Sequence, residues 1–164
     1  MNDEKGQLSG EYMLLVGSLI VVLMISIFMI ANENELNIAM AAAKSGADEG
    51  VASSSSAIYP KETFNEYDDR EGLKHPYSVS IVNVSYNSSG IDENYGKQKI
   101  QFKVYAKASV DYNKKELDSI GDRINYNLRK SVATSFNTTD STNKLYNPVF
   151  SNNYVFTTAN VVWV

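Results

Sequence analysis

The first part of the chain contains one long run of apolar residues. Residues 12–31 read YMLLVGSLIVVLMISIFMIA, and none of them carries a charge. A run of about 20 such residues is the length that an α-helix needs to cross a hydrocarbon layer of ~30 Å. The polar residues NENE follow at 32–35, where a secretory signal peptide would have a cleavage site of small residues. The pattern therefore predicts a transmembrane helix over 12–31 rather than a signal peptide or a buried core helix.

A thinner apolar stripe continues beyond this run at the helical spacing of three or four positions. Its members are Leu36, Met40, Ala43, Ala47 and Val51. The chain has no proline before Pro60, so we predict one continuous helix over 7–57. Small residues let helices approach closely, and we therefore expect the Ala-rich half of this helix to pack against neighbouring subunits.

The polar and apolar positions of residues 58–164 predict a small globular domain, called the head below. A charged loop over 61–74 precedes a strand over 77–86, and a loop over 87–96 leads to a second strand over 99–112. In the second strand, polar residues alternate with a row of apolar ones: Ile100, Phe102, Val104, Ala106, Ala108 and Val110. Such alternation is typical of an antiparallel strand with one buried face.

A helix is expected to follow these strands over 114–136. Asn113 and Glu116 have the spacing of a capping box at its start. Its apolar stripe consists of Leu117, Ile120, Ile124, Leu128 and Val132. The β-branched and aromatic residues of 153–164 predict a further strand that returns to the sheet. The fold class is therefore α+β: a long N-terminal helix, then an antiparallel sheet with one packed helix.

Composition narrows the classes of function. The net charge is −4 and the isoelectric point is near 5.0, without a cluster of Lys and Arg, which argues against a nucleic-acid surface. The chain has no cysteine, so the fold uses neither disulfides nor thiolate-bound zinc.

The chain offers only weak candidates for catalytic, metal or cofactor chemistry. His75 is the only histidine, and we interpret it as a strand-entry residue because a ligand or a catalytic base needs partners. DENYG at 92–96 lacks the glycine position and the distal Glu of a calcium loop. EYDDRE at 66–71 is a solvated loop or a loose cation site. We expect no enzyme, no catalytic residue, no metal and no cofactor.

Three N-x-S/T sequons lie in the head, at Asn83, Asn87 and Asn137. They are candidate glycosylation sites and are compatible with a head outside the cell. Asn83 is the weakest candidate, because it falls inside a predicted strand.

The residues directly before the apolar run, GQLSGEY at 6–12, form a motif. They resemble the class III signal peptide of archaeal type IV pilins, in which a polar leader ends in Gly and the mature chain starts with Gln. The family pattern is Q-x-S-x-E-[YF], and Gln7, Ser9, Glu11 and Tyr12 match its fixed positions. The resemblance covers the leader and the N-terminal helix and does not extend to the head.

The resemblance implies a pilin made as a membrane precursor. A prepilin peptidase would cut between Gly6 and Gln7, removing a leader of residues 1–6. An assembly platform would then move the helix from lipid into an extracellular filament of identical subunits, a pilus-like structure for surface adhesion. The alternative is a single-pass anchored surface protein that binds a ligand and never polymerises. An anchored enzyme is a more distant alternative.

Overall fold

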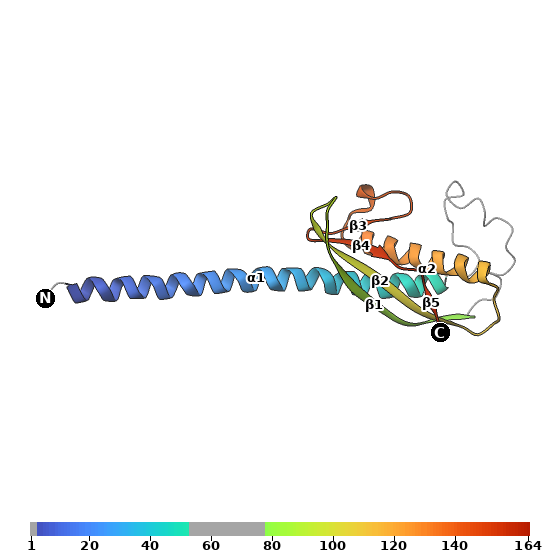
Figure 1. Ribbon diagram of the computed structural model, residues 1–164, viewed down its shortest axis with the longest axis horizontal. Coiled ribbons are helices and arrows are strands. Elements are labelled where there is room, and N and C mark those ends of the chain that lie inside the picture. The colour runs from blue at the N-terminus through green and yellow to red at the C-terminus, as the bar shows by residue number, and fades with distance from the viewer. Residues whose placement is uncertain (1–2, 53–77) are drawn as a thin grey trace. The chain divides into compact units, whose positions relative to one another are not determined.

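The computed structural model describes residues 3–52 and 78–164, with side chains from residue 10 onward. Figure 1 shows the order of the elements, which confirms the α+β class. They are α1 (Asp3–Ala52), β1 (Val79–Asp92), β2 (Lys97–Ala108), α2 (Lys114–Ser135), η3 (Thr139–Ser141), β3 (Val149–Phe150), β4 (Tyr154–Thr158) and β5 (Val162–Trp163). The interpretations of 61–74, of the acidic stretch 66–71 and of His75 concern residues outside those described.

Helix α1 is continuous, as the absence of proline predicts, and it already includes Asp3–Gly6 of the expected leader. The last residues of the predicted helix, 53–57, lie outside the described part of the chain. Contacts along the backbone divide the chain into two compact units, residues 1–36 and residues 37–164. This division differs from the expected boundary between 57 and 58, because the second half of α1 belongs to the head unit.

The sheet is mixed, which corrects the expectation of an antiparallel sheet. The strand order is β1-β2-β4-β3, and β5 pairs with β2 as well. Strands β1 and β2 are antiparallel, as are β3 and β4, but β4 and β5 both run parallel to β2. The predicted C-terminal strand over 153–164 therefore returns to the sheet as two short strands, between which Ala159 N donates a hydrogen bond to Phe102 O.

The β1–β2 hairpin is longer than the sequence suggested. The loop expected over 87–96 shrinks to the turn at 93–96, because Asn87 and Asp92 pair with Gln101 and Lys97 within the ladder. Cross-strand pairing outweighs the loop-like composition of this segment. At its other end β2 stops at Ala108, so the alternation expected up to Val110 is wrong there, and Val110 is exposed.

The core of the head lies between one face of the sheet and α2. The alternating residues of β2 from Ile100 to Ala106 are at most 1% exposed, as the alternation predicts. Four of the five residues in the predicted α2 stripe are fully buried: Ile120, Ile124, Leu128 and Val132. The ring of Phe156 in β4 stacks on Phe102, at 5.6 Å between centroids, and on Phe136 at the end of α2, at 5.8 Å. These rings join β2, β4 and α2 into one core.

The predicted start of α2 is confirmed. The Asn113 side chain accepts a hydrogen bond from Glu116 N (3.0 Å), and the Glu116 carboxylate accepts one from Asn113 N (2.8 Å). This reciprocal pair satisfies two backbone N–H groups that a helix start leaves open.

The Ala-rich half of α1 already has a partner within its own chain. Ala39, Ala43 and Ala47 are fully buried in the head unit. A Cβ on Gly46 would lie 2.8 Å from the Cα of Leu128, and one on Gly50 would lie 2.8 Å from the Cα of Ile124. The close approach is therefore between α1 and α2, where we had expected neighbouring subunits.

Candidate functional site: an apolar helix and a polar head

The first half of α1 presents an apolar surface all around the helix. Its large side chains, apart from the partly buried Val16, are exposed, from 49% at Ile20 to 77% at Leu14. Among the described residues, α1 is the one helix long and apolar enough to cross a membrane. The long apolar helix predicted from the sequence is present, and it is compatible with a transmembrane helix.

The residues of the N-terminal motif all lie on this helix. Gly6, Gln7 and Ser9 are helical in backbone, and the Glu11 and Tyr12 side chains are exposed. Positions four apart are neighbours on a helix surface, so Gln7 and Glu11 share one face, one turn apart. A cut before Gln7 would leave an amino group at the start of the helix, one turn before Glu11.

Comparisons were made with protein-family models, with curated proteins and with solved structures. None of the three finds a match to the chain.

The three sequon asparagines are all exposed. Asn83 and Asn87 lie on β1, where they pair with Tyr105 and Gln101, and neither is on the buried face. Asn137 lies two residues after the end of α2, with a positive φ of 53°. The placement of Asn83 inside a strand therefore does not block access to its side chain.

The acidic turn at 92–96 is held by its own contacts. Asp92 Oδ1 accepts a hydrogen bond from Asn94 N (3.0 Å), and Asp92 Oδ2 lies 3.9 Å from Lys99 Nζ. Within residues 10–52 and 78–164, no three His, Cys, Asp or Glu side chains form a group that could hold a metal ion.

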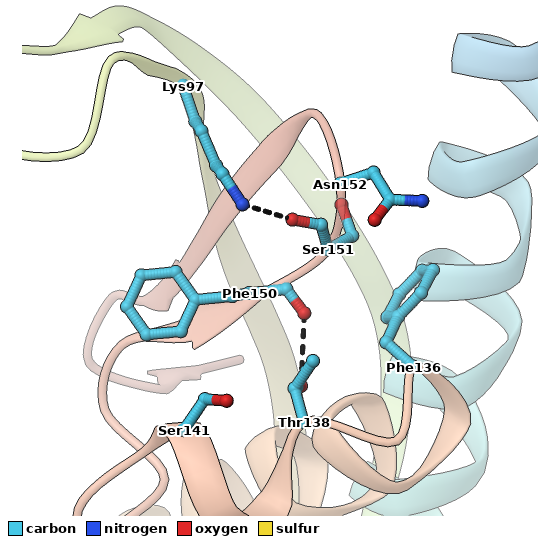
Figure 2. A pocket seen from close by; sticks show the side chains of 7 residues that line it. All are labelled: Lys97, Phe136, Thr138, Ser141, Phe150, Ser151 and Asn152. Atoms are coloured by element: carbon cyan, nitrogen blue, oxygen red, sulfur yellow. Dashed lines mark hydrogen bonds between the residues drawn. The ribbon is translucent and has the colours of Figure 1, made fainter.

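A small polar cleft lies where the end of α2 meets β3, with a volume of about 320 Å³ (Figure 2). Lys97 reaches across it and donates a hydrogen bond to Ser151 O (2.6 Å), and its ammonium lies 5.9 Å from the centre of the Phe150 ring. Thr138 closes another side by donating to Phe150 O (3.0 Å). The polar groups in this cleft hydrogen-bond to one another. These hydrogen bonds hold β2, β3 and the end of α2 together.

A second cleft, of about 440 Å³, lies between the first half of α2 and the C-terminal residues 160–163. Asp118, Asn125, Asn160 and Trp163 are among the residues that line it. Sequence reasoning missed this cleft, because its two walls are far apart in the chain. The one early signal is Trp163, the single tryptophan of the protein.

Proposed function

We propose that this chain is the structural subunit of an extracellular, type IV pilus-like filament, and that it polymerises through the first half of α1. The observation that carries the proposal is a helical surface over 12–31 that is uncharged, exposed all round, and preceded directly by the motif at 6–12. A prepilin peptidase cutting between Gly6 and Gln7 would release the mature subunit.

The apolar surface of residues 12–31 suits two environments, one before assembly and one after it. Before assembly, lipid would solvate the helix, as it solvates any apolar transmembrane helix. During assembly, helices of identical subunits would replace the lipid. A head-to-tail array of such subunits does not close on itself, and it therefore grows into a filament. Polymerisation thus gives a use for apolar surface on every side of the helix.

The position of Glu11 supports the same proposal. A carboxylate at the edge of an apolar run is costly to bury without a partner. The α-amino group created at Gln7 has a reference pKa of ~7.7–8.0 and is mostly protonated at neutral pH. Pairing between Glu11 and the amino group of an adjoining subunit would neutralise both charges as they leave water, and would fix the axial position of the new subunit.

The burial of the Ala-rich half of α1 limits which surface of the helix is available for contacts between subunits. Because Ala43 and Ala47 already pack inside the head unit, the inter-subunit contacts are assigned to residues 7–36 of the helix. The head would then lie outside the cell, with Asn83, Asn87 and Asn137 accessible for glycosylation, and would carry the adhesive role of the filament.

The substitution Glu11→Gln tests the proposal, because it keeps the shape and hydrogen bonding of the side chain and removes its charge. We expect normal cleavage and a folded head, but few or no filaments in electron micrographs of producing cells. The matched control is Glu93→Gln, which removes an exposed carboxylate in the turn between β1 and β2 of the head and should leave filament number near normal.

Two outcomes would contradict the proposal. Near-normal filament number from Glu11→Gln would mean that Glu11 only complements the positive end of the helix dipole, an effect of ~0.3–1 kcal/mol. An unaltered chain that is cut at Gln7 but stays in the membrane without filaments would favour the anchored surface protein.

A further inference from the structure

We propose that the outer face of β2 binds an acidic polysaccharide, a polymer of sugar rings that carry carboxylates. Three lysines mark this face, Lys99, Lys103 and Lys107, and they are called the lysine row below. The inference names a ligand class for the adhesive role of the head, and in this it rests on the proposed function. Binding is measured on the unpolymerised chain, so its failure is distinguishable from a failure to form filaments.

The lysine row lies on the face of the sheet that is turned away from the core. Side chains alternate between the two faces of a strand, and Phe102 and Val104 on the core face are at most 1% exposed. Lys103 and Lys107 are exposed, and the side chain of Lys99 is 39% exposed. At about 3.4 Å per residue, the row covers roughly 27 Å along one strand. A row of this length suits an extended polymer better than a compact ligand.

The positive charges of the row are not compensated across the ladder. The residues of β1 that pair with Lys103 and Lys107 are the uncharged Ser85 and Ser80. Among the described residues, Asp92 forms the one salt bridge of the row, with 3.9 Å between its Oδ2 and the Nζ of the third lysine. Opposite charges facing each other across two strands would be stabilising, and the sheet does not supply them here. A bound polyanion would supply them instead.

The lysine row has no protective role in the sheet. Natural sheets place lysines on edge strands, where they prevent pairing with the strands of other chains. Strand β2 is an interior strand, with β1 on one side and β4 and β5 on the other. It has no free edge to protect, which favours a ligand as the reason for its exposed lysines.

The residues between the lysines suit sugar rings. Gln101 and Tyr105 alternate with the lysines on the same face, and both are partly exposed. An amide both donates and accepts hydrogen bonds, as sugar hydroxyl groups do. The Lys103 ammonium lies 5.4 Å from the centre of the Tyr105 ring. The face therefore offers a flat aromatic surface to the C–H side of a sugar, with a positive charge beside it for a carboxylate.

Two other polyanions fit this face less well. Double-stranded DNA carries one charge per ~1.7 Å of its axis, whereas the lysines stand ~14 Å apart, so the row would neutralise few phosphates. Peripheral binding to a lipid surface combines basic residues with apolar side chains that enter the bilayer. The residues between the lysines are an amide and a phenol, so the face lacks such side chains.

The sequon residues Asn83 and Asn87 border the row, because they pair with Tyr105 and Gln101. They lie on β1, which is the edge strand of the described sheet. A glycan on either residue can extend past this edge and leave the lysine row open.

The experiment follows the fluorescence anisotropy of a labelled oligogalacturonate as the full chain is added, in an uncharged detergent without a sugar headgroup. The chain is produced in a bacterium without N-glycosylation, so that the face is bare. We expect saturable binding that weakens as the salt concentration rises, because salt screens charges on a surface. Labelled polyglutamate has carboxylates without sugar rings, and labelled maltodextrin has rings without carboxylates. Each should bind at least about tenfold more weakly than the oligogalacturonate.

A double variant assigns the binding to the lysine row. Lys103→Gln/Lys107→Gln should weaken oligogalacturonate binding about tenfold, because it removes two of the three charges. The matched control Lys114→Gln/Lys130→Gln removes two exposed lysines of α2, the helix on the opposite face of the sheet, and should leave the affinity unchanged.

Any of four results would overturn the inference. The first is the absence of saturable binding to oligogalacturonate, and the second is equal affinity for polyglutamate. The third is tighter binding to double-stranded DNA or to phosphatidylglycerol vesicles. The fourth is oligogalacturonate binding that the double variant of the row leaves unaffected.

Discussion

A Cβ placed on Gly46 of α1 would lie 2.6 Å from the backbone oxygen of Asn127 on α2. Real Cβ atoms do not approach other atoms so closely, so the two helices pack at a distance that only glycine allows. Gly50, one turn later, has the same relationship with α2. The last turns of α1 are therefore fixed to the head by direct backbone contact.

The variant Gly46→Ala should destabilise the head unit by about 1–3 kcal/mol, because the added methyl forces α1 and α2 apart. Thermal unfolding of the full chain in detergent, followed by circular dichroism, measures this effect. Gly17→Ala is the matched control, since a Cβ at Gly17 meets nothing within 4 Å. An unchanged melting temperature for Gly46→Ala would show that the helices do not pack this closely.

Phe102→Ala should destabilise the head by ~3–5 kcal/mol, since Phe102 is 1% exposed and stacks on Phe156. That is a large share of the stability of a small domain. The control is Ile91→Ala, which truncates a side chain that is 74% exposed and should change stability by less than ~0.5 kcal/mol. Chemical denaturation measures the midpoint of unfolding of both variants. Equal midpoints for Phe102→Ala and Ile91→Ala would contradict the packing of Phe102 in the core.

Replacing Gly6 with leucine should block processing, because the peptidase would recognise the glycine before the cut. We expect full-length precursor in the membrane fraction of cells that also produce a prepilin peptidase, detected by its larger mass on immunoblots. Gly10→Leu, beyond the cut, serves as the control. Mature protein of normal size from Gly6→Leu would defeat the assignment of the cleavage site.

Glycans are expected at Asn83, Asn87 and Asn137, because all three side chains are exposed and accessible to a transferase. Glycopeptide mass spectrometry of the native protein checks each site separately, and the exposed Asn94, which lies outside any sequon, is the internal control. If all three asparagines are unmodified, the sequons are chance matches.

Local patterns predicted the elements that depend on local physics. The alternation from Ile100 to Ala106 and the capping box of Asn113 and Glu116 identified β2 and α2, because side-chain period and helix capping act over a few residues. The apolar run at 12–31 predicted the first half of α1 for the same reason.

Features that depend on distant contacts were not predictable in this way. A β-rich segment such as 153–164 indicates a strand, but its composition does not specify that it runs parallel to β2. The small residues of α1 indicated a close neighbour, but not that α2 of the same chain supplies it. The cleft between α2 and residues 160–163 is hidden from the sequence for a similar reason, since Asp118 and Trp163 line it together only after folding.

We propose above that the mature chain, starting at Gln7, builds a filament through its N-terminal helix. The most direct test is mass spectrometry of filaments sheared from producing cells and separated from membranes. We expect this chain to be a main component of the filaments, with an N-terminal peptide that begins at Gln7, either free or cyclised to pyroglutamate. Finding the chain only in the membrane fraction, with residues 1–6 still attached, would contradict it.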